Sequence, residues 1–101
     1  MIDRITVRSS NPPSIEFDHN VRAWYIRFKK AKVAKTVHKD RSNIVLAVDL
    51  DSNNEVVGVE LLGVREFSIN LFKKITNIDA PKIDFNRARF VAASCRELCG
   101  A

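Results

Sequence analysis

Two apolar runs, residues 44–50 and 56–62, flank a short polar turn and form the clearest pattern in the chain. With Asn53 and Asn54 as the two central residues of the turn, three apolar pairs face each other: Leu46 with Leu61, Val48 with Val59, and Leu50 with Val57. All three pairs lie on one face, and a slip of one residue would move them into water. Asparagine also tolerates the positive φ that a type I′ turn requires at both central positions. The pattern therefore predicts a β-hairpin.

Alternation of apolar and polar residues predicts shorter extended segments before the hairpin. They cover residues 5–7, 15–17, 24–28 and 33–37. In the third segment two sets of side chains alternate: Trp24, Ile26 and Phe28 on one side, Tyr25 and Arg27 on the other. A period of two with aromatic and β-branched residues indicates a half-buried strand.

The spacing of apolar residues becomes helical after Gly63. Phe67, Leu71 and Ile75 recur at every fourth position and predict a helix over residues 66–76. Further along, a second amphipathic helix opened by Asp84 as N-cap fits the remaining apolar residues, which are Phe85, Ala88, Val91, Ala92 and Cys95. At least one helical turn is expected at residues 84–88. Residues 89–93 also fit a short strand that caps the edge of the sheet, and both alternatives stay open.

These elements predict an α+β fold: a small antiparallel β-meander of four or five strands, followed by one or two C-terminal helices packed on one face. The 101 residues fit a single domain, with the sheet over residues 3–63 and the helical part over residues 66–98. Apolar residues make up 46%, which excludes a disordered chain. No apolar run approaches the ~20 residues of a membrane-spanning helix, so no membrane partner is expected. The first ten residues lack the apolar core of a signal peptide, so a cytoplasmic location is expected.

Basic residues are concentrated in one part of the chain. The net charge is +5, yet residues 22–41 alone hold eight basic side chains and one acidic one, so the remainder is slightly acidic. Basic side chains bind phosphates, and an exposed ring such as that of Tyr25 stacks on bases. The candidates for nucleic-acid binding are Arg22, Tyr25, Arg27, Lys29, Lys30, Lys32 and Lys35. The competing interpretation is a solvated strand face and loop, because Trp24 and Phe28 fall on the core side.

Acidic residues around the turn carry the spacing of a calcium loop. Counted from the first aspartate, the ligand positions fall on oxygen-bearing side chains: Asp49, Asp51, Asn53, Glu55 and Glu60. Two observations argue against an EF-hand. The sixth position requires glycine and holds Asn54, and the flanking runs are β-branched where helices are needed. We therefore interpret the segment as a hairpin.

Three carboxylates share the polar face of that hairpin in the predicted register: Asp49, Asp51 and Glu60. Such a group holds a divalent metal or performs acid–base chemistry in some proteins, so these residues are the metal-site candidates. Neither a histidine nor a serine or cysteine nucleophile is linked to them by spacing, and we predict no catalytic residue and no enzyme. An ion pair between Glu60 and Arg27 is the expected structural role.

The two cysteines, Cys95 and Cys99, are four positions apart near the end of the sequence. In a cytoplasmic protein they are expected to be free thiols. A structural zinc site needs four ligands, which here requires the fold to bring His19 and His38 beside both thiols. A second paired-ligand motif is missing, so no cofactor is predicted.

Residues 15–63 carry a set of motifs in order: Phe17-Asp18, then Ala23-Trp24-Tyr25-Ile26-Arg27-Phe28, then Asp49-Leu50-Asp51, then Val56-Val57-Gly58-Val59-Glu60-Leu61-Leu62. With these motifs the chain resembles the domain of unknown function 2283 family, a set of small bacterial and archaeal proteins. It departs from the family at Arg22, where aspartate is usual, and at Asn54, where glycine is usual. The resemblance implies a small β-meander with helical decoration and implies no activity. Members are often encoded beside small toxin-like proteins, so it suggests an antitoxin-like or partner-binding role by analogy.

The leading functional hypothesis is a non-enzymatic protein-interaction module that self-associates into a homo-oligomer or binds a protein partner. A small sheet leaves edges and faces to be covered, which favours this hypothesis. The first alternative is nucleic-acid binding through residues 22–41. The second is a divalent-metal site at Asp49, Asp51 and Glu60.

Overall fold

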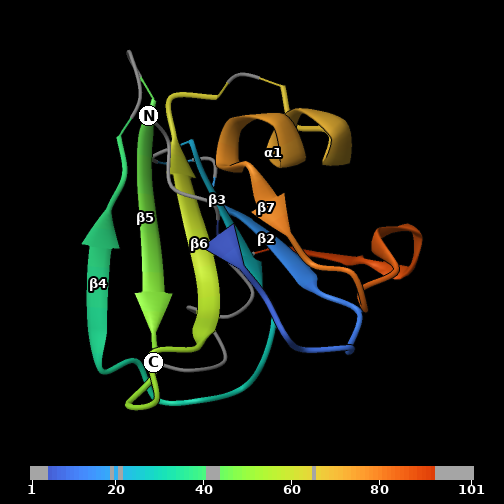
Figure 1. Ribbon diagram of the computed structural model, residues 1–101. Coiled ribbons are helices and arrows are strands. Elements are labelled where there is room, and N and C mark those ends of the chain that lie inside the picture. The colour runs from blue at the N-terminus through green and yellow to red at the C-terminus, as the bar shows by residue number, and fades with distance from the viewer. Residues whose placement is uncertain (1–4, 19, 21, 41–43, 65, 93–101) are drawn as a thin grey trace.

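The computed structural model describes residues 5–18, 20, 22–40, 44–64 and 66–92, and these residues form two sheets and one α-helix (Figure 1). In chain order the elements are β1 (Ile5–Thr6), β2 (Ser14–Asp18), β3 (Ala23–Arg27), β4 (Lys35–His38), β5 (Val45–Leu50), β6 (Val56–Leu62), α1 (Ile69–Thr76), β7 (Ile78–Asp79), the 3-10 turn η1 (Phe85–Arg87) and β8 (Arg89–Ala92). Among the described residues, no helix is long and apolar enough to cross a membrane.

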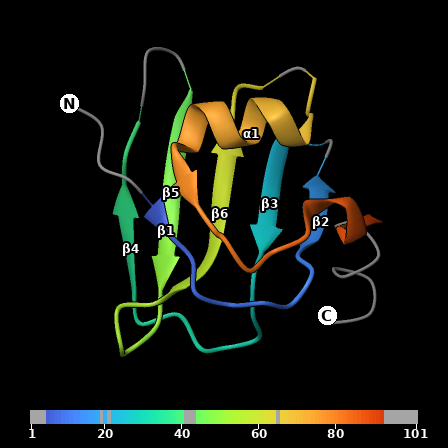
Figure 2. The ribbon, with the colours of Figure 1, turned by 45° about the vertical axis from the view of Figure 1, so that its right-hand side comes forward.

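The main sheet has six strands in the order β4-β5-β6-β3-β2-β8. Its neighbouring strands are antiparallel except β2 and β8, which are parallel. A second, two-stranded parallel sheet joins β1 to β7. Figure 2 shows α1 lying across one face of the main sheet, with β1 on the same side. We refer to this side as the core face and to the other side as the open face.

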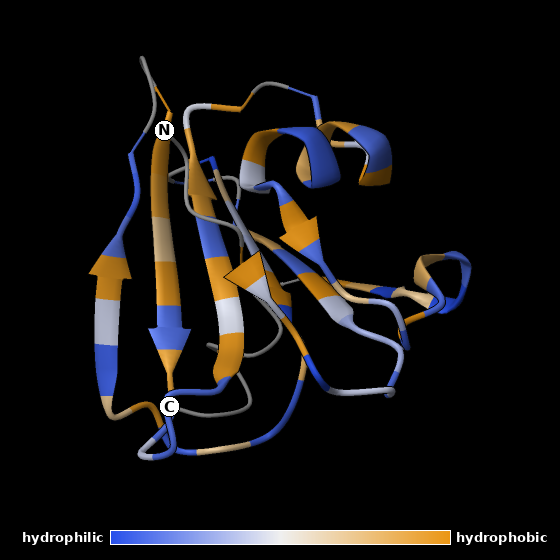
Figure 3. Cartoon of the chain, viewed as in Figure 1, coloured by the Kyte–Doolittle hydropathy of each residue, from blue (hydrophilic) through white to orange (hydrophobic). Residues whose placement is uncertain are grey.

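The hairpin predicted from the apolar pattern is β5–β6, and most of its register is confirmed. Val48 pairs with Val59 and Leu46 with Leu61, while Asp49 faces Gly58 on the open face. Figure 3 shows both strands of the hairpin as mostly hydrophobic, with hydrophilic or intermediate bands between the hydrophobic ones. The prediction is wrong at the turn, because Leu50 pairs with Val56 and not with Val57.

A three-residue loop with a bulge replaces the predicted type I′ turn. The amide of Asn54 donates to the carbonyl of Asp51, and the amide of Asp51 donates to the carbonyl of Glu55. Asn54 has φ 63°, whereas Asn53 is not in the left-handed region. One left-handed residue after a turn is the usual form of the three-residue hairpin loop. The extra residue of the bulge is Val57, because Asp49 pairs with Gly58 and Leu50 with Val56, and β5 ends at Leu50, just before Asp51.

The core lies between the sheet and α1. A row of aligned apolar residues crosses the core face, formed by Val48, Val59, Ile26 and Ile15. Phe72 of α1 covers this face, with 1% of its surface exposed and with the rings of Phe28, Phe67 and Phe85 around it. Aromatic side chains thus join the helix, the sheet and the 3-10 turn in one apolar cluster.

Both ends of α1 are capped by its own sequence. The hydroxyl of Ser68 accepts a hydrogen bond from the amide of Leu71, and Asn77 ends the helix with φ 50°. The hydroxyl of Thr76, which is fully buried, donates to the carbonyl of Phe72 at 2.7 Å. The cap at Ser68 explains why the helix begins at Ile69 and not at residue 66, and the left-handed Asn77 ends it after Thr76.

The predicted fold class, α+β with C-terminal helices on a meander of four or five strands, is wrong. The described part of the chain is mostly β, with a six-stranded mixed sheet and one α-helix of eight residues. The region predicted to be helical contains two strands, β7 and β8. Asp84 does open a helical turn, since its carboxylate accepts from the amide of Asn86, but this turn is three residues of 3-10 helix.

Residues 89–92 form the edge strand that was one of the two alternatives for this segment. β8 pairs in parallel with β2, and the amide of Arg89 donates to the carbonyl of Pro13 at 3.0 Å. The partner strand lies near the other end of the sequence, so local periodicity carries no sign of the pairing. The predictions made for Cys95, Cys99 and His19 fall on residues outside those that the structure describes.

Candidate functional site

A hydrogen-bonded group on the open face joins three strands. The hydroxyl of Tyr25 donates to one carboxylate oxygen of Asp49 at 2.8 Å, and the hydroxyl of Thr36 donates to the other at 2.6 Å. Burial, together with the neighbouring Asp49 carboxylate, raises the pKa of Tyr25 well above its usual value. The phenol is therefore a neutral donor at physiological pH, and Asp49 holds strands β3, β4 and β5 together.

Gly58 makes this arrangement possible. A Cβ atom at this position would overlap the phenol of Tyr25, lying only 2.6 Å from Cε2. The ring of Tyr25 therefore lies directly over the backbone of β6 on its way to Asp49. A glycine inside an apolar strand often marks a bulge or the close approach of a large side chain, and here the approaching side chain is Tyr25. A ring in this position is not free to stack on a base.

Arg27 lies beside this group on the open face. Its Nε atom is 3.3 Å from a carboxylate oxygen of Glu16, and its guanidinium carbon lies 5.1 Å from the centre of the Tyr25 ring. Glu16 and Glu60 both face Tyr25 in the sheet register, one on each side of β3, and Arg27 pairs with Glu16 and not, as predicted, with Glu60. Glu16 is 6% exposed, and its charge fixes the orientation of Arg27.

Lys29 forms the second charged group, at the tip of the β5–β6 hairpin. Its ammonium lies 2.5 Å from the carboxylate of Asp51 and 3.2 Å from that of Glu55. The other oxygen of Asp51 accepts from the backbone amides of Asn53 and Glu55. The hydrogen bond from Lys29 lowers the pKa of Asp51, and these amides lower it further. The bond to Asp51 also raises the pKa of Lys29.

Replacing Asp51 with asparagine should remove an acid-dependent part of the stability. The folded-state pKa of Asp51 lies below its usual value of 3.8, so its stabilisation is complete above about pH 4 and is lost as the pH falls through the lowered pKa. Urea unfolding measured from pH 2 to pH 7 at intervals of about one pH unit gives the free energy of unfolding at each pH. As the pH falls, this free energy should decrease less for Asp51→Asn than for the unchanged protein. The matched control is Glu66→Gln, an exposed acid in the described part of the chain. Equal declines for the parent and Asp51→Asn would contradict the assignment.

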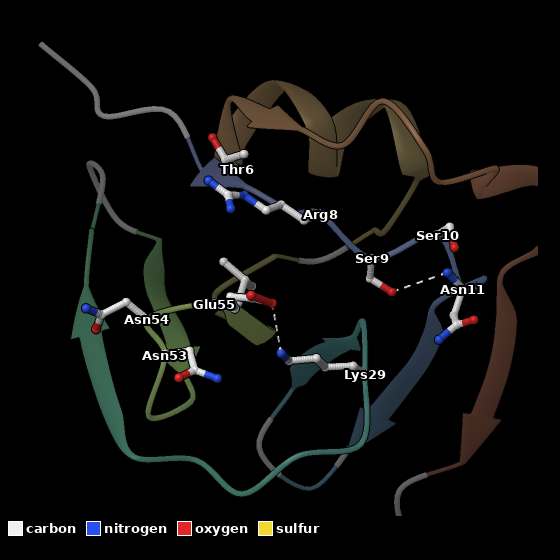
Figure 4. A pocket seen from close by; sticks show the side chains of 10 residues that line it. Thr6, Arg8, Ser9, Ser10, Asn11, Lys29, Asn53, Asn54 and Glu55 are labelled. Carbon is white, nitrogen blue, oxygen red and sulfur yellow. Dashed lines mark hydrogen bonds and ion pairs between the residues drawn. The ribbon is translucent and has the colours of Figure 1, made fainter.

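A polar hollow of about 660 Å³ opens beside the hairpin tip (Figure 4). Figure 4 shows Lys29 directed at Glu55, with Arg8 on the segment that follows β1 above them. Ser9 and Asn11 continue the wall, and the Ser9 hydroxyl accepts from the amide of Asn11 at 3.2 Å. Lys29, one of the cations that line this hollow, is already paired with the carboxylates of Asp51 and Glu55, which reduces its attraction for an anion.

A second hollow, of about 430 Å³, adjoins the first and is more strongly basic. Asn11 and Lys29 line both hollows. The remaining polar lining of the second hollow comes from three segments and comprises Ser14, Arg27, Lys30 and Arg89. Its lining contains four basic side chains and no carboxylate.

The three metal-site candidates do not form one cluster. Asp49 is bonded to Tyr25 and Thr36, Asp51 is bonded to Lys29 in the loop, and Glu60 lies beside Tyr25 in the sheet register. Among the residues that the structure describes, no three His, Cys, Asp or Glu side chains are close enough to hold a metal ion. The bulge at Leu50 separates Asp51 from the other two carboxylates.

The seven nucleic-acid candidates are spread over the length of β3 and beyond it. Arg22 precedes β3 with φ 52°, whereas Lys29, Lys30 and Lys32 follow its far end. A strand of five residues is about 17 Å long, so these two groups lie at opposite ends of the sheet. Lys35 begins the edge strand β4. Of the seven candidates, only Arg27, Lys29 and Lys30 meet in one hollow.

Sequence reasoning missed two residues that belong to these sites. Arg89 enters the second hollow through the parallel pair β2–β8, and Thr36 reaches Asp49 through the pair β4–β5. For Thr36 the period-two pattern of residues 33–37 contains the signal, since it places Thr36 on the face opposite Val37. For Arg89 no local signal exists, because its neighbours come from the start of the chain.

Comparison with known families gives one match. The family model described as a protein of unknown function, DUF2283, matches residues 14–65. The matched segment contains the whole meander from β2 to β6, including Tyr25, Asp49 and Gly58, and leaves out α1 and β8. No curated protein and no solved structure matches the chain. The match spans half of the sequence and contains the motifs on which the resemblance rests, so the chain belongs to the DUF2283 family of proteins of unknown function.

Proposed function

We propose that the protein is a protein-interaction module that self-associates through the edge strand β8. The observation that supports this proposal is the exposure of apolar side chains on that strand. Phe90 is 66% exposed and Val91 is 42% exposed, and they project from opposite faces of the sheet. Among the described residues, β8 has β2 on one side and no strand on the other. An edge strand with exposed apolar residues on both faces favours pairing with another strand.

The opposite edge of the sheet has different chemistry. β4 begins with Lys35 and ends with His38, and three of its four residues are exposed. Lysine on an edge discourages pairing with a further strand because its charge would have to be desolvated. The contrast between the two edges favours β8 as the joining edge.

A second copy of the chain is the partner that fits this edge. Two β8 strands related by a two-fold axis through Phe90, perpendicular to the sheet, would pair in antiparallel fashion. Each Phe90 would then lie beside the other, and each Arg89 would face Val91 of the other copy. This arrangement covers the exposed apolar side chains and avoids opposing the two arginines.

The variant Val91→Lys should convert a self-associated protein into monomers. Lysine at this position would lie directly opposite Arg89 of the other copy, and two like charges facing each other across paired strands are destabilising, whereas the lysine is solvated in the monomer. Size-exclusion chromatography with light scattering at low micromolar concentration measures the mass against the 11.5 kDa of one chain. Val33→Lys is the matched control, because Val33 is 40% exposed but lies in the loop before β4. We expect a dimer for the unchanged protein and for Val33→Lys.

Two results would count against the proposal. A monomeric mass for the unchanged protein would exclude self-association and leave only a foreign protein partner. A dimer that persists in Val91→Lys would place the interface elsewhere on the molecule. Thermal melting of each variant checks that the fold is retained, since Val91 is exposed and its replacement should leave the core intact.

A further inference from the structure

We propose that the second hollow, lined by Ser14, Arg27, Lys30 and Arg89, binds a phosphate group. Three segments that are distant in sequence line the hollow: residues 11–14 up to the start of β2, the end of β3 with the three residues that follow it, and the start of β8. A volume of about 430 Å³ is within the range of small-ligand sites. The site does not depend on self-association of the chain.

Arg27 is held in a position suited to phosphate recognition. The carboxylate of Glu16 takes its Nε–H, and the Tyr25 ring lies against its guanidinium plane. A guanidinium has five N–H donors, so the four on its terminal nitrogens remain for a ligand. Arginine binds phosphate through two parallel hydrogen bonds from such a fork. Because Glu16 and Tyr25 already fix the side chain, little conformational entropy is lost when a ligand binds.

Arg89 approaches from the other side of Ser14. In the sheet register, Ser14 faces Arg27 on β3 and Arg89 on β8, so the three residues form one row on the open face. Neighbouring strands are about 4.8 Å apart, which places the two arginine backbones about 10 Å apart. Both long side chains can reach a single phosphate between them, and the Ser14 hydroxyl lies in the middle of the row.

Lys30 and Arg89 supply the charge that attracts the anion. Lys29 is committed to Asp51 and Glu55, and the charge of Arg27 is balanced by Glu16. Among the described residues, neither Lys30 nor Arg89 forms an ion pair, and both are exposed. The two free cations therefore give the hollow its positive potential, and the held guanidinium gives it directional donors.

Titration followed by amide NMR spectra tests the site at low ionic strength. The probes are inorganic phosphate, adenosine monophosphate and a short thymidine oligonucleotide. Saturable shifts should centre on Ser14, Arg27, Lys30 and Arg89. We expect Lys30→Gln and Arg89→Gln each to weaken binding by about tenfold, which is the usual loss for one charged hydrogen bond. Lys74→Gln is the matched control, since it removes an exposed charge from α1 on the core face of the sheet.

The outcomes are distinct from one another. Binding of phosphate and the monophosphate, weakened by both variants but not by the control, supports a small phosphorylated ligand. Tighter binding of the oligonucleotide with the same pattern supports the same site with a nucleic-acid strand as the source of the phosphate. An absence of saturable shifts with all three probes, or equal weakening by Lys74→Gln, would overturn the proposal. Lys30 follows β3, which β2 separates from β8, so its variant leaves the β8 strand unchanged and separates phosphate binding from self-association.

Discussion

Replacing Phe72 with alanine should lower the free energy of unfolding by about 4 kcal/mol, which is within the usual range for a buried phenylalanine. Phe72 is 1% exposed and is the one buried apolar side chain of α1 among the described residues. Its ring centre lies 6.2 Å from those of Phe67 and Phe85 and 6.3 Å from that of Phe28. Truncation removes this apolar surface and leaves a cavity between the helix, the sheet and the 3-10 turn.

Urea denaturation followed by tryptophan fluorescence measures this loss, because Trp24 stacks on Phe67 in the same cluster. Small domains are stable by about 5–15 kcal/mol, so the variant should keep only part of the free energy of unfolding of the unchanged protein. Lys74→Ala on the exposed side of the same helix is the matched control and should change stability by less than about 0.5 kcal/mol. A loss below about 1 kcal/mol for Phe72→Ala would mean that α1 does not dock on the sheet as described.

Replacing Gly58 with alanine should lower the free energy of unfolding by about 3 kcal/mol. The added methyl group would overlap the Tyr25 ring, and overpacking of this kind costs about 1–3 kcal/mol. Moving the ring also breaks the hydrogen bond from Tyr25 to Asp49, which adds about 1 kcal/mol. The sheet backbone cannot yield easily, because β6 pairs with a strand on each side.

A double-mutant cycle separates this clash from the ordinary cost of alanine in place of glycine. In a Tyr25→Ala background the ring is absent, so Gly58→Ala should cost less than about 1 kcal/mol. The coupling energy between the two positions should then be about 2 kcal/mol. Additive costs would show that Tyr25 does not lie over Gly58. Chemical denaturation of the four proteins under one set of conditions provides the measurement.

The hairpin was predictable because its register is encoded by side chains that are neighbours across a short turn. Val48 with Val59 and Leu46 with Leu61 are the pairs that the apolar pattern requires. The pattern could not place the bulge, because a three-residue loop and a two-residue turn bury almost the same apolar residues. The difference depends on the carboxylate of Asp51, which accepts two amides of its own loop and thereby stabilises the longer turn.

The C-terminal part was predicted least well for a physical reason. Phe85, Ala88 and Val91 have a spacing that fits a helix, yet only Phe85 of these lies in a helical turn. The exposed edge of β2 offers backbone partners to residues 89–92, and pairing with it outweighs the local helical preference. The same long-range pairing brings Arg89 to the second hollow, so the site and the fold were missed together.

The ion-pair partner of Arg27 shows another limit of prediction from the sequence. The expected pair with Glu60 requires the two side chains to share a face, and the structure places them on one face of the adjacent strands β3 and β6. β2 carries Glu16 along the other side of β3, at the position that mirrors that of Glu60, and the guanidinium of Arg27 turns to Glu16. Alternation along a strand shows which face a side chain occupies, but it does not reveal which strands lie on either side.

The two parallel pairs, β1–β7 and β2–β8, join the beginning of the chain to its end. Contacts between distant segments form late, since a long loop must close before they stabilise the fold. During synthesis the meander from β2 to β6 can assemble from adjacent segments as they leave the ribosome. The outer edge of β2 stays unpaired until residues 89–92 follow. The growing chain thus presents an open strand edge from the synthesis of β2 until that of β8, and an unpaired edge of this kind promotes aggregation.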